Sequence, residues 1–236
     1  MKLYIYPIFT ALFFLSSCIN AQEPVYNKKN SIKPQSVRSI DDVYAELDFG
    51  QVIKHKKIQG EFVSIETNEA TGKYVSKLVS KESMPSLKYV SYAEDKKDVF
   101  VFGKQTFNLK NKMDPSSLSA YWLYSYGRNY LCIIGKGQSA SGSGVQVSYF
   151  ALLELENSRK AKSCQEFVSR FGNINSLVDY NKNGDIAYLR IVNGKEMGQY
   201  LLTINDIKTN QQLGKRSLLL KYELNDKFIV LQNNAN

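Results

Sequence analysis

The chain has 236 residues, of which 43% are hydrophobic and 22% are charged, and its formal net charge at pH 7 is +9. This length suffices for one large domain or two small ones, and the apolar content excludes an intrinsically disordered chain. The lysines are scattered, so the basic charge does not predict a nucleic-acid-binding protein. Sixteen tyrosines and twelve phenylalanines, beside many valines and isoleucines, favour β-strands.

The N-terminus has the features of a bacterial export signal. Lys2 supplies a positive charge, and residues 3–15 form an apolar run. The run is shorter than the about 20 apolar residues that span a bilayer. It ends in Leu15-Ser16-Ser17-Cys18, which resembles the lipobox of bacterial lipoproteins. The resemblance implies cleavage before Cys18, a diacylglycerol on its sulfur, and an anchor in an envelope membrane, the outer membrane if the cell is Gram-negative.

Ordinary signal cleavage after Ala21 is the alternative, and it would leave a secreted or periplasmic protein. Residues 18–38 are polar, contain two prolines and show no periodicity, which predicts a tether. The predicted organisation is therefore a signal peptide at 1–17, a lipidated N-terminus and tether at 18–38, and a single β-rich domain at 39–236.

Three cysteines are present, which is an odd number. If Cys18 carries lipid, Cys132 and Cys164 remain as a pair in an oxidising compartment, which predicts a disulfide between them. Closing that loop of about thirty residues would add about 3–4 kcal/mol to the free energy of unfolding in the chain-entropy model. The alternative is two buried free thiols, because Cys132 lies in the apolar run 130–134.

Three capping patterns predict short helices. Ser39 and Asp42 have the spacing of a capping box, and apolar residues recur at helical spacing over 40–47. Asp114-Pro115 is typical of a helix start and predicts a second helix. A further capping-box spacing predicts a third helix over 164–171.

Alternating hydrophobicity predicts about a dozen strands, joined mostly as hairpins. The predicted strands lie at 61–65, 73–79, 87–92, 98–102, 107–109, 130–134, 145–155, 176–178, 186–192, 199–204, 217–224 and 227–231. The predicted fold is therefore mainly β: an antiparallel, meander-rich sheet, sandwich or open barrel, with two or three short peripheral helices.

Residues 179–185, Asp-Tyr-Asn-Lys-Asn-Gly-Asp, resemble the core of the calcium-binding loops of EF-hands and of FG-GAP-type propeller blades. The resemblance implies calcium as a cofactor, with oxygen ligands from Asp179, Asn181, Asn183 and Asp185. The loop departs from the EF-hand pattern at its twelfth position, where Arg190 replaces the bidentate glutamate. The competing interpretation is a hairpin turn, for which Asn183-Gly184 is a strong signal.

The sequence contains no recognisable catalytic motif. The single histidine, His55, lies among lysines that would repel a metal cation, so we expect a surface residue rather than a base or ligand. The glycine- and serine-rich stretch 135–144 lacks both the P-loop and the Gly-x-Ser-x-Gly patterns, and is predicted to be a loop. The single tryptophan, Trp122, is predicted to belong to the core.

Three functions are compatible with these features. The favoured one is a non-catalytic binding or structural module of the bacterial envelope, whose partners are the membrane and an envelope protein or glycan. The second is an ion or small-ligand binder that uses the 136–144 loop or the 179–185 loop. The third is a carboxylate-dependent hydrolase of envelope glycans, in which two distant acids meet in the fold. A non-catalytic role is favoured over an enzymatic one, which stays open, and nucleic-acid binding is not expected.

Overall fold

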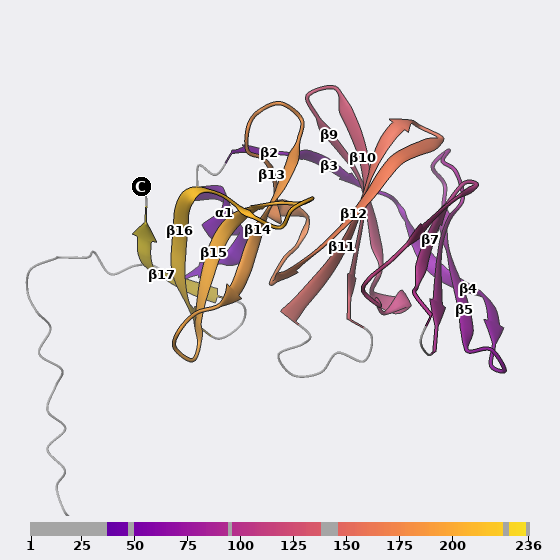
Figure 1. Ribbon diagram of the computed structural model, residues 1–236, viewed down its shortest axis with the longest axis horizontal. Coiled ribbons are helices and arrows are strands. Elements are labelled where there is room, and N and C mark those ends of the chain that lie inside the picture. Colours follow the sequence, from indigo (N-terminus) through magenta and orange to yellow (C-terminus); the bar gives the residue numbers. More distant parts are fainter. Residues whose placement is uncertain (1–36, 47–49, 94–95, 138–145, 224–226, 235–236) are drawn as a thin grey trace, which may run out of the picture. The chain divides into compact units, whose positions relative to one another are not determined.

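The computed structural model describes residues 37–46, 50–93, 96–137, 146–223 and 227–234 (Figure 1). Strands dominate this part of the chain, so the predicted mainly β fold is confirmed. No helix within it is long and apolar enough to cross a membrane. The predicted signal peptide, Cys18, the Ala21 cleavage site and nearly all of the predicted tether lie outside the described residues, as does most of the predicted loop at 135–144.

The helical elements are short. They are the helix α1 (Ile40–Glu46) and the 3-10 turns η1 (Pro115–Ser117) and η3 (Ile174–Ser176). The strands of the described chain are β1 (Arg38–Ser39), β2 (Gln51–Val52), β3 (Lys54–Lys57), β4 (Gly60–Asn68), β5 (Lys73–Ser80), β6 (Leu87–Tyr92), β7 (Val99–Phe102), β8 (Gln105–Asn108), β9 (Ser119–Ser125), β10 (Arg128–Lys136), β11 (Val147–Asn157), β12 (Lys160–Arg170), β13 (Leu177–Asp179), β14 (Ile186–Asn193), β15 (Gln199–Asp206), β16 (Gln212–Glu223) and β17 (Lys227–Asn234).

These strands form three antiparallel sheets. The N-terminal sheet has the order β4-β5-β6-β7-β8, the central sheet β12-β11-β10-β9-β3, and the C-terminal sheet β1-β17-β16-β15-β14-β13-β2. Strands that follow one another in the chain mostly pair with one another, as the predicted meander requires. Arg38, the last residue of the predicted tether, already belongs to the C-terminal sheet, where it pairs with Phe228.

The central sheet packs against another sheet on each of its faces, as in the predicted sandwich. One face carries Leu131 and Ile133, which pack in a core with Tyr89 and other residues of the N-terminal sheet. The other face carries Cys132, which packs in a second core with Tyr188 and other residues of the C-terminal sheet. Because the side chains of a strand alternate between faces, β10 needs the uninterrupted apolar run seen in its sequence.

The first predicted helix is confirmed. The Ser39 backbone N–H donates to Asp42 Oδ2 over 3.1 Å, and the Asp42 N–H donates to Ser39 Oγ over 3.1 Å. This reciprocal pair satisfies the N–H groups of Ser39 and Asp42 at the start of the helix. Ile40, Val43 and Tyr44 are buried and pack with residues of the C-terminal sheet. The helix therefore covers that sheet, as its apolar spacing predicted.

The other two helix predictions are wrong. Asp114 does act as an N-cap, since its Oδ1 accepts from the Ser116 N–H over 2.9 Å, but the helix is a single 3-10 turn followed by β9. The predicted helix over 164–171 is occupied by β12 instead. Capping patterns report only local preference, and pairing with β11 along its whole length outweighs that preference. Trp122 is half-buried on β9 and packs against the core, as expected.

The predicted disulfide is also wrong, because Cys132 and Cys164 are both free. Cys132 lies on β10 and Cys164 on β12, and β11 runs between these two strands. Strands two places apart are separated by about 10 Å, whereas a disulfide needs Cα atoms within about 7 Å. The side chains also point to opposite faces: Cys132 packs with the core that includes Tyr188, and Cys164 with the core that includes Tyr89.

Candidate functional site

The loop at 179–185 connects β13 to β14, which pair with Asp179 opposite Ile186. The predicted hairpin is thus confirmed. Asp179 is 0% exposed. Its Oδ2 accepts from the Ser125 hydroxyl and from the Gly184 N–H, both over 2.7 Å, and its Oδ1 accepts from the Asn183 N–H over 3.1 Å. These three donors compensate for the loss of water around the buried carboxylate.

Further contacts fasten the same loop to the central sheet. The exposed Asp185 accepts from Arg128 Nη1 over 2.6 Å, and the Tyr130 hydroxyl donates to the Gly184 carbonyl over 2.7 Å. Ser125, Arg128 and Tyr130 all belong to the β9–β10 hairpin. We call this set of contacts the loop joint. It connects the C-terminal sheet to the central sheet.

The four candidate calcium ligands differ in exposure. Asp179 is buried, whereas Asn181, Asn183 and Asp185 are exposed. Asn183 Oδ1 accepts from the Asp185 N–H, and its Nδ2 donates to Asp185 Oδ2, both over 2.9 Å. In the described part of the chain, no three His, Cys, Asp or Glu side chains are placed to hold a metal ion. Calcium binding at Asp179, Asn181, Asn183 and Asp185 stays a prediction.

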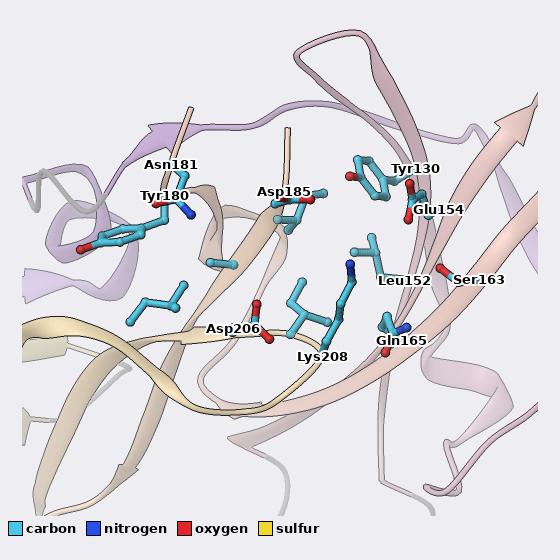
Figure 2. Close-up of a pocket in the computed structure, with 14 residues that line it drawn as sticks. Tyr130, Leu152, Glu154, Ser163, Gln165, Tyr180, Asn181, Asp185, Asp206 and Lys208 are labelled. Carbon is cyan, nitrogen blue, oxygen red and sulfur yellow. The ribbon is translucent and has the colours of Figure 1, made fainter. Parts of the chain in front are cut away.

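A polar pocket of about 130 Å³ adjoins the loop joint (Figure 2). The central sheet contributes Tyr130, Leu152, Glu154, Ser163 and Gln165; the 179–185 loop and β14 contribute Tyr180, Asn181, Asp185, Ile186 and Ala187; the segment around the β15–β16 turn contributes Asp206, Ile207, Lys208 and Leu213. This volume is below the roughly 300–1,000 Å³ of typical ligand pockets. It is large enough for a small ion or a few water molecules.

The acidic groups of this pocket are held by neighbouring donors. Glu154 is paired with Lys162 over 3.2 Å. Asp206 accepts from the Thr209 N–H over 2.7 Å and from its hydroxyl over 2.9 Å. Burial raises the pKa of Asp206, but the hydrogen bonds from Thr209 and the Lys208 backbone and charge outweigh it and lower the pKa below its ordinary value.

A glycosidase needs one carboxyl with a raised pKa to act as general acid. The lowered pKa of Asp206 does not suit the role of general acid, although it suits the second carboxylate, which stays ionised. Figure 2 shows the Lys208 side chain extending from the turn toward the middle of the pocket. The lining of this pocket is polar enough to hold a small polar or charged group.

Other residues considered in the sequence lie elsewhere. His55 is an exposed residue of β3, as predicted, with its Nδ1 at 3.3 Å from the Ile53 carbonyl oxygen. Ser125, Arg128 and Tyr130, by contrast, were not expected to contact the 179–185 loop. They precede Asp179 and its neighbours by more than fifty positions, and no local pattern marks them as partners.

No family model matches this chain, and no curated protein or solved structure matches it significantly. A functional proposal therefore rests on the residues of this chain.

Proposed function

We propose that this protein is a lipid-anchored, non-catalytic binding or structural module of the bacterial cell envelope. The observation that carries the proposal is the Leu15-Ser16-Ser17-Cys18 motif at the end of the apolar N-terminal run. Acyl chains on Cys18 would hold the β domain at a membrane without a spanning segment. The polar residues that follow Cys18 would give the domain reach from the membrane surface.

The pocket chemistry supports a binding role over a catalytic one. Asp179, Asp185 and Glu154 each contact a donor side chain of the protein, and Asp206 is held by the turn that contains it. Groups committed in this way position the sheets and the turn. They are poorly suited to transfer protons, because a general acid or base must exchange its proton with the substrate.

The test is metabolic labelling of the full-length protein with radioactive palmitate in a bacterial host. We expect label in the parent protein and in Cys164→Ala, and no label in Cys18→Ala. The Cys18→Ala variant should also leave the membrane fraction. Label that persists in Cys18→Ala, or its absence from the parent, would defeat the anchoring proposal. A mature N-terminus at Gln22 would support the secreted alternative.

The second candidate function is binding of an ion or small polar ligand at the pocket beside the loop joint. It is supported by the contact of Asn181 and Asp185 with this pocket and by the inward Lys208 side chain. Isothermal titration with millimolar calcium tests the cationic form of this idea. Heat that is present in the parent and reduced in Asp185→Asn would support it, and no heat from the parent would remove it.

A further inference from the structure

A second cleft, of about 460 Å³, lies at the tip of the β9–β10 hairpin. This volume falls in the range of about 300–1,000 Å³ that is typical of ligand sites. Its lining includes two tyrosines, two primary amides and two cations: Tyr124, Tyr126, Gln51, Asn129, Lys54 and Arg128. The chain enters this region through β2, which pairs in the C-terminal sheet, and leaves it through β3, which pairs in the central sheet.

The backbone conformation at Tyr126 is unfavourable for a tyrosine. Ser125 pairs with Arg128, which leaves Tyr126-Gly127 as a two-residue turn, and their φ angles are +43° and +75°. A type I′ turn needs positive φ at both places and normally uses asparagine, aspartate or glycine there. A bulky side chain at positive φ is a strained exception.

The Tyr126 ring gains little from burial, because the residue is 55% exposed. Neither the turn nor the core therefore accounts for a tyrosine at this position. Strain that the fold does not require is a feature of sites where a side chain serves a ligand. The consequence is a ring displayed to solvent at the mouth of the cleft.

Tyr124 lies between two polar side chains on the neighbouring strands. It is 47% exposed, and it pairs directly with Lys54 on β3 and with Asn129 on β10. Residues directly opposite in antiparallel strands point to the same face, with Cβ atoms about 5 Å apart. An ammonium group, an aromatic ring and a carboxamide therefore lie side by side at an exposed end of one face of the central sheet.

This combination matches the chemistry of an acidic sugar chain. An exposed tyrosine ring offers an apolar face, with a polar hydroxyl at its end, to the C–H face of a pyranose. The amides of Gln51 and Asn129 each offer donors and an acceptor to neighbouring sugar hydroxyls. Lys54 favours a carboxylate or phosphate substituent, and among the described residues that line the cleft none is acidic. Arg128 adds a second cation, whose Nη1 is already paired with Asp185.

We propose that this cleft binds an acidic glycan through Tyr124 and Tyr126. The inference deepens the proposed envelope function, on which it rests for the source of the glycan, by naming the class of partner. Aromatic rings beside cations also stack on the bases of single-stranded nucleic acid. The exported location favours the glycan, and the experiment includes both probes.

The experiment titrates the full-length protein, purified in detergent, with tetragalacturonate, maltotetraose and a ten-residue oligothymidylate. We expect binding of tetragalacturonate in preference to the neutral sugar and the oligonucleotide. Tyr126→Gly and Tyr124→Ala should each weaken this binding by about tenfold, which corresponds to the loss of one aromatic contact. Tyr74→Ala is the matched control, since Tyr74 is 40% exposed on β5 and should leave binding unchanged.

Tyr126→Gly separates a binding role from a structural one. Glycine adopts positive φ without strain, so this variant should raise the thermal midpoint of unfolding while it weakens binding. A lowered midpoint, or unchanged binding in both cleft variants, would overturn the proposal. Equal binding of the neutral sugar, tighter binding of the oligonucleotide, or no binding of tetragalacturonate would also overturn it.

The outcomes are separable from those of palmitate labelling. Glycan binding without labelling of Cys18 would defeat the anchor and leave the cleft assignment intact. Labelling of Cys18 without glycan binding would support the anchor and defeat the cleft assignment.

Discussion

Two buried aspartates stabilise different regions of this protein in different ways. Asp98 is 1% exposed and Asp179 is 0% exposed. The partners of Asp98, the Tyr89 hydroxyl and the Tyr92 N–H, both lie on β6 of the same sheet. The partners of Asp179 come from its own turn and from Ser125 of another sheet. One aspartate therefore stabilises the interior of a sheet, and the other joins two sheets.

The electrostatic consequences differ as well. Burial raises the pKa of Asp98, and the hydrogen bonds from Tyr89 and Tyr92 and the charge of Lys112 offset this only in part. The Tyr89 hydroxyl has a single proton but lies against two acceptors, the Asp98 carboxylate and the Met113 carbonyl. Protonation of Asp98 would satisfy the second acceptor. By contrast, the two carboxyl oxygens of Asp179 accept from three donors, the N–H groups of Asn183 and Gly184 and the Ser125 hydroxyl.

The largest effect should come from Asp179→Ala. The change leaves the N–H groups of Asn183 and Gly184 and the Ser125 hydroxyl without their acceptor. We expect the free energy of unfolding to fall by about 3–5 kcal/mol, as it does when a buried charged partner is removed. Urea denaturation of the parent and variant measures the difference.

Asp185→Ala is the control for that experiment. It removes the exposed ion pair with Arg128 from the same loop. Exposed pairs contribute about 0–1 kcal/mol, so this loss should be much the smaller. Equal losses in the two variants would show that the buried carboxylate has no special part in the loop joint.

Tyr89→Phe should have the second largest effect. It leaves Asp98 and the Met113 N–H, which donates to the Tyr89 hydroxyl over 2.8 Å, without that partner. We expect a loss of about 2 kcal/mol in the free energy of unfolding, because buried polar groups become unsatisfied while the ring keeps its packing. A loss greater than that of Asp179→Ala would reverse the ranking of the two regions.

The third effect is a pH dependence specific to Asp98. Because its pKa is raised in the folded protein, the folded state holds the proton more tightly than the unfolded state does. The resulting stabilisation is complete below the ordinary pKa of 3.8 and is lost as the pH rises through the higher native value. The free energy of unfolding of the parent, relative to Asp98→Asn, should therefore decrease with rising pH. Urea titrations from below pH 3.8 to neutrality measure this slope.

Glu82 should give a pH dependence of stability opposite in sign to that of Asp98. The Trp122 indole N–H donates to its carboxylate over 2.8 Å and, together with Lys56, lowers its pKa despite partial desolvation. Its stabilisation is present above the ordinary value of 4.5 and is lost as the pH falls through the native value. The parent should therefore gain stability relative to Glu82→Gln as the pH rises. Slopes of the same sign in both comparisons would contradict the assignment.

The periodic features of this fold could be predicted from the sequence. The strand predicted at 87–92 agrees with β6 in both bounds, and the helix that follows Ser39 forms with its capping box. The conformation of both elements is determined by residues that are close together in the sequence. The helix predicted at 164–171 failed because pairing with β11 is a tertiary effect, which outweighs a local capping pattern.

The candidate site shows the same limit. The Asn183-Gly184 signal predicted the turn between β13 and β14. It did not indicate which residues the aspartates of this turn contact. Asp179 and Asp185 bond to Ser125 and Arg128, and only the packing of two sheets brings these residues together. Local sequence therefore indicated a calcium loop or a turn, and the structure shows an intersheet joint.

The smallest expected effect concerns the cysteines, and it bears on whether the two aspartates can be compared. A Cys132–Cys164 bond would stabilise the central sheet independently of Asp179 and would mask part of the Asp179→Ala loss. Since β11 separates the two thiols, a reductant should not change the thermal midpoint of unfolding.

Alkylation tests the same assignment directly. In denaturant without reductant, Cys132 and Cys164 should both be alkylated, as mass spectrometry would show. In the native protein, burial and the nearby Glu166 raise the pKa of Cys164 to about 12, so alkylation should be slow. If alkylation adds mass only after reduction, the two cysteines form a disulfide after all. The strand order of this sheet would then have to differ from the one described.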